Sequence, residues 1–309
     1  MQVFVTGATG FIGGAVTERL IAHGHQVVGL SRSEGAAERL RTMGAIPHTG
    51  DLSDHASLRA AAQAADAVVH AAFGHDDWSR MDLSFQQDAA AVHAMLDVLA
   101  GTNKPLIYTS GSGVLGDTGP HAVDETMPGS RAGDVGLRTH LEETVIEAGK
   151  RNIGGFVLRP GLVYGRSGGG VMHMLIDLAR RSGAATTVGS GGNVWSAVHI
   201  DDLVGAYLLA LVSPQNGLFN VADNNVFTMR DIAAAIGRML GYAGEVAQWP
   251  LEEARSAIGM LADGLASNKR ISAAKAHAVL GWSAAAPSII AEIETGSYAS
   301  LRDAANAEH

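Results

Sequence analysis

The sequence predicts an α/β fold in which a doubly wound parallel sheet carries helices on both faces. Patterns typical of strands and helices alternate through the first half of the chain, which is the order that a parallel sheet requires. The run 67–72 (AVVHAA) is almost continuously apolar, as expected of a strand buried on both faces. A glycine-rich segment joins the first strand pattern to the first helix pattern. Together these three observations define the fold class.

The glycine segment, 6–13 (TGATGFIG), lies between an apolar strand pattern and a helical pattern that ends at Gly24. In such a loop Gly7 permits a tight turn, Gly10 lets a pyrophosphate approach the backbone, and Gly13 lets the helix pack on the strand. The negative charge of the ligand then meets the free N–H groups at the start of the helix. The order of strand, loop and helix favours nucleotide binding over an ordinary turn.

The second strand is expected at 26–30, and its end is where a dinucleotide meets the protein through its ribose. A site for NAD places Asp or Glu there to accept a hydrogen bond from the 2′-hydroxyl. This chain has Ser31, Arg32 and Ser33 instead. A guanidinium pairs with a 2′-phosphate, and flanking hydroxyls donate to it. The sequence therefore predicts NADP(H); the alternative is that Arg32 is a solvated loop charge.

The remaining elements follow in chain order. Strand patterns occupy 45–49, 105–110, 155–159 and 218–222, and helical patterns occupy 33–43, 81–100, 134–151, 171–181, the residues from 200 and 228–240. We expect a glycine-rich loop at 161–170 and helices after 241. The predicted domains are a nucleotide-binding core at 1–165, rejoined by about 193–225, and a mostly helical substrate region made of 166–192 and 226–309.

The composition argues against several classes of function. The chain has 22 Lys and Arg against 31 Asp and Glu, so its formal charge of −9 argues against nucleic acid as a partner. The absence of cysteine excludes disulfides, thiolate catalysis and Cys-based metal sites, and we expect no metal. No apolar stretch approaches the roughly 18 residues of a membrane span, and the N-terminus does not have the pattern of a signal peptide. We therefore expect a cytoplasmic protein that binds no membrane.

Several separate blocks resemble the extended short-chain dehydrogenase/reductases, and the resemblance covers nearly the whole chain. Besides the glycine segment, the blocks are 50–52 (GDL), 70–72 (HAA), 158–165 (LRPGLVYG), 198–203 (VHIDDL), 219–222 (FNVA) and 280–282 (LGW). The resemblance implies a Rossmann core with a smaller C-terminal substrate region, and a homodimer through two core helices. It also implies cofactor contacts from Thr6, Thr9, Phe11, Ile12, Asp51, Leu52, Ala71, Ala72, Pro160 and Gly161.

The helix expected near Asp134 departs from the family pattern. The family's chemistry rests on Tyr-x-x-x-Lys at the start of this helix. Here Arg138 stands at the Lys position and Asp134 at the Tyr position, and no tyrosine lies between Tyr108 and Tyr164. The chain therefore resembles the atypical members that keep the cofactor site and lose this pair. We expect Arg138 to position the cofactor; the alternative is a surface ladder of ion pairs between Asp134, Arg138 and Glu142.

Reduction of a carbonyl needs a stabilised oxyanion and a proton in addition to hydride. Ser110 and Ser112 follow the strand whose end faces the cofactor, so their hydroxyls are candidates to stabilise the oxyanion, although they suit a glycine-rich turn equally. Tyr164 and His140 are candidate proton donors. As alternatives, Tyr164 packs as an aromatic side chain and His140 lies on a helix surface. A substrate hydroxyl or a water is a further source of the proton.

The predicted function is an NADP(H)-dependent ketoreductase or carbonyl reductase that acts on a small or medium-sized molecule. The segments 75–78 and 172–174 and Trp195 are expected to line the substrate pocket or its lid, which suits a hydrophobic carbonyl. One alternative is a nucleotide-sugar epimerase or dehydratase, and the loss of the tyrosine base argues against it. A second alternative is a non-catalytic NADP(H) sensor, which the same loss favours.

Overall fold

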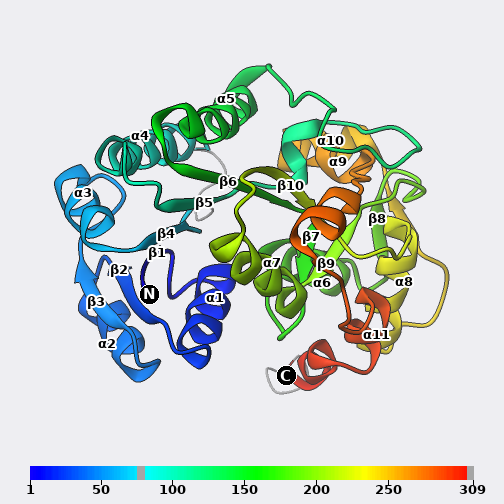
Figure 1. Cartoon of the computed structure of the whole chain (residues 1–309). Coiled ribbons are helices and arrows are strands. Elements are labelled where there is room, and N and C mark those ends of the chain that lie inside the picture. Colours follow the sequence, from blue (N-terminus) through cyan, green and yellow to red (C-terminus); the bar gives the residue numbers. More distant parts are fainter. Residues whose placement is uncertain (75–80, 305–309) are drawn as a thin grey trace.

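A seven-stranded parallel sheet forms the centre of the computed structural model, which describes residues 1–74 and 81–304. The strand order is β10-β6-β5-β4-β1-β2-β3, and every neighbouring pair is parallel (Figure 1). This arrangement confirms the predicted fold class. The strands are β1 (Gln2–Thr6), β2 (Gln26–Ser31), β3 (Ile46–Thr49), β4 (Ala67–His70), β5 (Pro105–Thr109), β6 (Gly154–Pro160) and β10 (Gly217–Val221).

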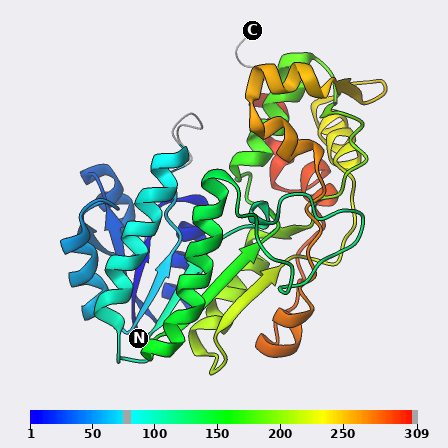
Figure 2. The same cartoon turned by 90° about the horizontal axis from the view of Figure 1, so that it is seen from above.

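Helices cover both faces of this sheet (Figure 2). One face carries α1 (Phe11–Ala22), α2 (Glu34–Thr42) and α7 (Ile200–Val212), and the other carries α3 (His55–Ala64), α4 (Met81–Leu99) and α5 (Gly133–Glu147). Within the described part of the chain, no helix is both long enough and apolar enough to cross a membrane.

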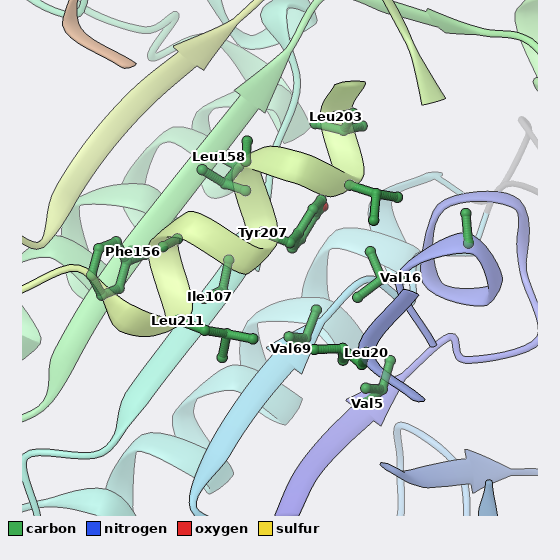
Figure 3. Packing of buried hydrophobic residues seen from close by; sticks show 14 of the residues in the cluster. Val5, Val16, Leu20, Val69, Ile107, Phe156, Leu158, Leu203, Tyr207 and Leu211 are labelled. Atoms are coloured by element: carbon green, nitrogen blue, oxygen red, sulfur yellow. The ribbon is translucent and has the colours of Figure 1, made fainter. Parts of the chain in front are cut away.

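Alternation along the strands builds a separate core on each face of the sheet. Val5 and Ile107 point to the α1 and α7 side, where Figure 3 shows them near Leu20 and Tyr207. Phe4, the neighbour of Val5, points to the opposite core. This period of two is what a strand buried on both faces requires. Each fully buried aliphatic side chain contributes about 1.5–3 kcal/mol, so both faces hold the sheet in place.

The C-terminal region has its own core around α6 and α8. Its helix α8 begins as the sequence predicts, because Thr228 and Asp231 form a reciprocal capping box. Its elements are α6 (Gly170–Ser182), β8 (Thr186–Val188), α8 (Met229–Leu240), β11 (Ala247–Trp249), α9 (Leu251–Ile258), α10 (Met260–Ala266), α11 (Ile289–Glu294), η5 (Ser297–Ser300) and α12 (Leu301–Ala304).

Three local expectations need correction. The loop expected at 161–170 contains β7 (Leu162–Tyr164), which pairs with β9 (Ala197–His199). The region expected to be helical after 241 contains β11, which pairs with β8. The segment 276–282, assigned to the substrate region, packs in the core beside α7, because the Trp282 indole donates to Asp202 O at 2.7 Å.

Candidate functional site

The glycine loop lies at the carboxyl end of β1, where the chain turns into α1. Gly7 has φ +69°, a left-handed conformation that favours glycine, and a Cβ there would lie 2.7 Å from Ala72 N. A Cβ on Gly13 would lie 2.2 Å from Gly7 O. These are the tight turn and the close helix packing that the sequence predicts for Gly7 and Gly13.

The start of α1 presents backbone donors to the same loop. Gly10 is the N-cap residue and contributes no side-chain hydrogen bond, so no cap side chain occupies the first N–H groups of the helix. The Phe11 ring packs so closely that a Cβ on Gly168 would lie 2.3 Å from it. Thr9 and Ile12 are half-buried beside it. Free amides at the positive end of a helix fit a pyrophosphate.

The end of β2 carries the three residues predicted to select the cofactor. Arg32 is exposed there, directly before the first turn of α2. The Ser33 hydroxyl accepts a hydrogen bond from Ala36 N at 3.3 Å and caps α2. The Ser31 hydroxyl is buried and donates to His48 O at 3.3 Å. The prediction that Ser31 faces a ribose phosphate therefore needs correction, whereas Arg32 and Ser33 remain at the surface.

Asp51 and Leu52 follow β3 at the same edge of the sheet. Asp51 is exposed, and its Oδ1 accepts from the Ser53 hydroxyl at 2.6 Å, Ser53 N at 2.7 Å and Asp54 N at 3.2 Å. These bonds, above all those from Ser53, lower the pKa of Asp51. Leu52 is half-buried against the core under α3 and α4. The carboxylate therefore stays charged and fixed, which suits an acceptor for a ligand N–H.

Ala71, Pro160 and Gly161 line the middle of the carboxyl edge. Ala71 follows β4 and is half-buried, and Pro160 ends β6. A Cβ on Gly161 would lie 2.2 Å from Ser196 O, so this position requires glycine for close backbone contact. Ala71 lies against the glycine loop, and Pro160 and Gly161 lie at the same carboxyl edge of the sheet, at the end of β6.

A buried chain of polar side chains connects the loop to α4. Strand register places Thr6, His70 and Tyr108 side by side across β1, β4 and β5. Thr6 Oγ1 lies 2.8 Å from His70 Nδ1, and His70 Nε2 lies 2.8 Å from Asp88 Oδ1. The Tyr108 hydroxyl donates to Asp88 Oδ2 at 2.6 Å. Burial raises the pKa of Tyr108 well above its usual range, so this hydroxyl stays protonated.

Sequence reasoning did not find this chain of contacts. The sequence does hold one indication of these contacts: Asp88 lies inside an apolar helix pattern. A carboxylate rarely lies in a core without donors around it.

The serine turn, 110–116, contains η2 (Ser112–Leu115) and is fixed by a buried ion pair. Ser110 donates its hydroxyl proton to Glu142 Oε1. Glu142 also accepts from Arg159, whose Nε lies 3.2 Å from Oε1. Both charged side chains are buried, so Glu142 pairs with β6 and not with a ladder on the surface of α5. Because Ser110 uses its only proton on Glu142, the hydroxyl of buried Ser112 is the better candidate to face a substrate oxygen.

Arg138 lies beside this turn and not in solvent. Its Nη2 donates to Thr109 O at 2.8 Å, and its guanidinium carbon lies 4.5 Å from the centre of the Phe73 ring. Its Nε is buried and makes no hydrogen bond within the described residues. The side chain as a whole is only half-buried, so another part of the guanidinium can face a ligand oxygen. The geometry therefore supports a positioning role and contradicts the surface ladder.

The two predicted proton donors lie elsewhere. Tyr164 is buried, and its hydroxyl lies 2.8 Å from Pro287 O and 3.1 Å from Asp223 Oδ2. Burial raises the pKa of both Tyr164 and Asp223. His140 is exposed on α5, 3.8 Å from Glu143. The expectation that either residue donates the proton is therefore corrected: Tyr164 ties β7 to the C-terminal region, and His140 faces solvent.

A cavity of about 810 Å³ lies between α6, α9 and β11. It begins at Gly170, two residues after the glycine that contacts Phe11, and extends along α6. Of the segment 172–174, His173 and Met174 line this cavity, whereas Met172 is fully buried. Trp195 does not line this cavity, and its indole N–H donates to Ser267 O at 2.9 Å. The segment 75–78, also expected to line the substrate pocket, falls outside the described residues. The other lining is mixed: it has the apolar side chains of Leu175, Leu178, Ala247, Trp249, Pro250, Ile258 and Leu265, and the polar or charged ones of Asp177, Arg181, Ser182, Thr186, Gln248 and Glu253.

Comparison with known proteins gives one family for most of the chain. The model of the NAD-dependent epimerase/dehydratase family matches residues 3–222. An uncharacterised protein of Schizosaccharomyces pombe is 32% identical over 301 residues, which are 96% of this chain and 100% of that protein.

Two further matches differ in chemistry. The 4-hydroxy-2-methyl-3-oxo-4-farnesyl-3,4-dihydroquinoline-1-oxide ketoreductase of Stigmatella aurantiaca is 28% identical over 266 residues, 83% of this chain and 78% of that enzyme. Among solved structures, UDP-glucose 4-epimerase of Thermotoga maritima superposes with a TM-score of 0.80 at 21% identity, covering 98% of this chain and 100% of the epimerase. At that identity the structural match establishes the fold.

Proposed function

Because this chain belongs to the NAD-dependent epimerase/dehydratase family, we propose that it is an NADP(H)-dependent reductase of a ketone or aldehyde with a large apolar part. One observation carries the proposal. An intact cofactor loop lies at the same sheet edge as a serine turn anchored by Glu142 and Arg159, while α5 offers Arg138 where the family has its lysine. The cofactor loop keeps the family's pattern, and the sequence has no tyrosine at the position of the base that oxidises sugar hydroxyls.

The residues present fit the cofactor. Gly7 and Gly13 leave no room for a Cβ, and the start of α1 supplies amides for the pyrophosphate. Arg32 stands at the end of β2, where an NAD site has Asp or Glu, and its guanidinium suits a 2′-phosphate. The half-buried Arg138, at the position of the family's lysine, suits the ribose next to the nicotinamide. When bound, NADPH supplies hydride to the carbonyl carbon.

The protein's own residues supply orientation and electrostatics. The Ser112 hydroxyl donates to the carbonyl oxygen as negative charge develops there. Ser110, Glu142 and Arg159 hold the turn that carries Ser112, so little reorganisation is needed during the reaction. Ser110 is thus a positioning residue, which revises the expectation that both serines act on the substrate.

The cavity beside α6 supports the apolar substrate class. Its volume of about 810 Å³ lies in the range of sites for drug-sized ligands. The ketoreductase of Stigmatella aurantiaca is named for a substrate with a farnesyl group. We place the apolar part of the substrate along Leu178 and Trp249, with the carbonyl at the serine turn.

The test combines binding and turnover on one sample. NADPH and NADH are titrated by fluorescence, and NADPH oxidation is then followed with ketones of increasing alkyl length. The proposal predicts tighter binding of NADPH and a kcat/KM that rises with chain length. Leu178→Trp should narrow the cavity and reduce the rise of kcat/KM with alkyl length, whereas exposed Val212→Trp should leave that rise intact. Tight binding without turnover would favour the sensor, and activity on a nucleotide sugar would favour an epimerase.

A further inference from the structure

The proton for the reduced oxygen has no source among the residues assigned so far. Tyr164 is engaged with Pro287 and Asp223, His140 is exposed, and a serine hydroxyl is too weak an acid to release a proton. The C-terminal region, however, carries a buried lysine, Lys269, that touches the serine turn.

Lys269 lies between the serine turn and the loop after β6. Its Nζ donates to Gly116 O, at the end of η2, at 2.6 Å, and to the Ser267 hydroxyl at 2.8 Å. Its backbone pairs with the 194–196 segment, where Ser196 N donates to Lys269 O at 2.9 Å. Ser196 O in turn accepts from Leu162 N at 2.8 Å, next to Gly161. Lys269 therefore contacts the serine turn through its side chain and the segment next to Gly161 through its backbone.

The ammonium retains donor capacity for a ligand. An ammonium has three N–H donors, and the two bonds to Gly116 and Ser267 use two of them. Two charged groups flank it: Asp117, whose charge raises the pKa of Lys269 against the larger lowering by burial, and Arg270, the next residue in the chain. Asp117 accepts from Gly119 N and Asn268 N, and Arg270 donates to Pro120 O. Within residues 1–74 and 81–304, no carboxylate forms an ion pair with Lys269.

We propose that Lys269 is the general acid that delivers the proton to the carbonyl oxygen, an inference that rests on the proposed reductase function. The carbonyl carbon receives hydride, the C=O π electrons move to the oxygen, and that oxygen takes the proton as the Nζ–H bond breaks. The neutral amine regains a proton from solvent, which completes the balance. Burial, the main cause, lowers the pKa of Lys269, and this makes the ammonium a stronger acid at working pH.

Kinetics of two variants test the assignment. Lys269→Gln keeps an N–H donor for Gly116 O and removes the titrating proton, and Lys269→Met removes both. General acids contribute typically about 10²–10⁴-fold, so we expect kcat to fall by that amount in both variants while NADPH affinity stays near wild type. The melting temperature should stay near wild type in Lys269→Gln and fall in Lys269→Met, which leaves Gly116 O without its donor. Lys275→Met is the matched control, because this half-buried lysine also donates to a carbonyl, Leu218 O at 2.8 Å.

The pH profile separates an acid from a structural lysine. The reaction needs the ammonium form, so kcat should fall as pH rises through the pKa of Lys269, at lower pH than for an ordinary lysine. In Lys269→Arg the guanidinium keeps its proton over this pH range. We therefore expect kcat to be lower than in the wild type and to show no fall at alkaline pH. Wild-type kcat in Lys269→Gln across the pH range would overturn the proposal and leave the reductase function standing.

An NMR titration tests the same residue without any turnover. The chain has four lysines, so ¹³Cε-labelled lysine gives a simple spectrum of the cofactor-free protein. We expect one signal to titrate below the others and to be missing from Lys269→Arg. Ordinary titration of all signals would overturn the assignment of Lys269 as the acid. If the wild type reduces no ketone but one lysine signal still titrates at lower pH than the others, the proposed reductase function is wrong, while the lowered pKa of Lys269 is confirmed.

Discussion

The cofactor side and the reaction side of this sheet edge are built in different ways. On the cofactor side, backbone atoms approach so closely at Gly7 and Gly13 that no side chain fits. On the reaction side, the arrangement depends on side chains that pair across elements: Ser110 with Glu142, and Glu142 with Arg159. A glycine in backbone contact admits no side chain unless the chain shifts, whereas a side-chain network can change when its paired residues are exchanged together. A chain can therefore keep its cofactor loop and still exchange the groups that perform the chemistry.

Breaking the reaction-side network should have the largest effect on stability. Glu142→Ala leaves Arg159 buried without its carboxylate, which costs about 3–5 kcal/mol of unfolding free energy. Glu143→Ala is the control, because the Arg131–Glu143 pair is exposed and contributes less than about 1 kcal/mol. Urea unfolding of both variants measures the difference. Equal losses in the two would contradict a structural role for the buried pair.

Removal of the Ser112 hydroxyl should affect rate and leave binding unchanged. Loss of one donor to a developing oxyanion lowers kcat roughly 10²–10³-fold. Steady-state kinetics and NADPH titration of Ser112→Ala separate the two effects. Ser130→Ala, which removes a hydroxyl that accepts from Ala132 N in the same loop region, should retain its rate. A fully active Ser112→Ala enzyme would remove this residue from the mechanism.

A methyl group in the cofactor loop should impair binding and packing together. Gly13→Ala forces a Cβ against Gly7 O, and such overpacking costs about 1–3 kcal/mol. Gly14→Ala places its Cβ at an ordinary 3.6 Å from Ala8 O and should be tolerated. Calorimetric titration with NADPH compares the neighbours. Similar affinities in both variants would show that the loop is not the cofactor site.

The smallest expected change is one of preference between cofactors. Arg32→Asp removes charge-assisted hydrogen bonds to a 2′-phosphate, which are worth about 1.5–3 kcal/mol, and so weakens NADPH binding roughly 10–100-fold. NADH has no such phosphate and should bind at least as well as before. Arg39→Asp, on the exposed part of α2, makes the same change in net charge and should not alter the preference. Equal loss for both cofactors would contradict the NADP(H) assignment.

The sequence predicted the sheet and its helices well, because glycines and caps mark their ends. Thr228 and Gly241, for example, bracket α8 as its pattern predicts. It also identified Gly7 and Gly13, whose roles follow from local backbone geometry. It could not predict that Glu142 pairs with Arg159, because that contact depends on how α5 packs on β6. For the same reason the sequence offered Tyr164 as a candidate proton donor: its hydrogen bond to Pro287 O joins residues far apart in the chain and depends on the tertiary packing.

Deuterium transfer tests the central claim most directly. The enzyme is incubated with NADPH deuterated at the transferable C4 position and an alkyl ketone, and the alcohol is examined by mass spectrometry and NMR. Reduction by this chain predicts deuterium on the carbinol carbon, in a single stereochemical configuration. An alcohol without deuterium, or no alcohol from any ketone despite tight NADPH binding, would contradict the account of this protein as a carbonyl reductase.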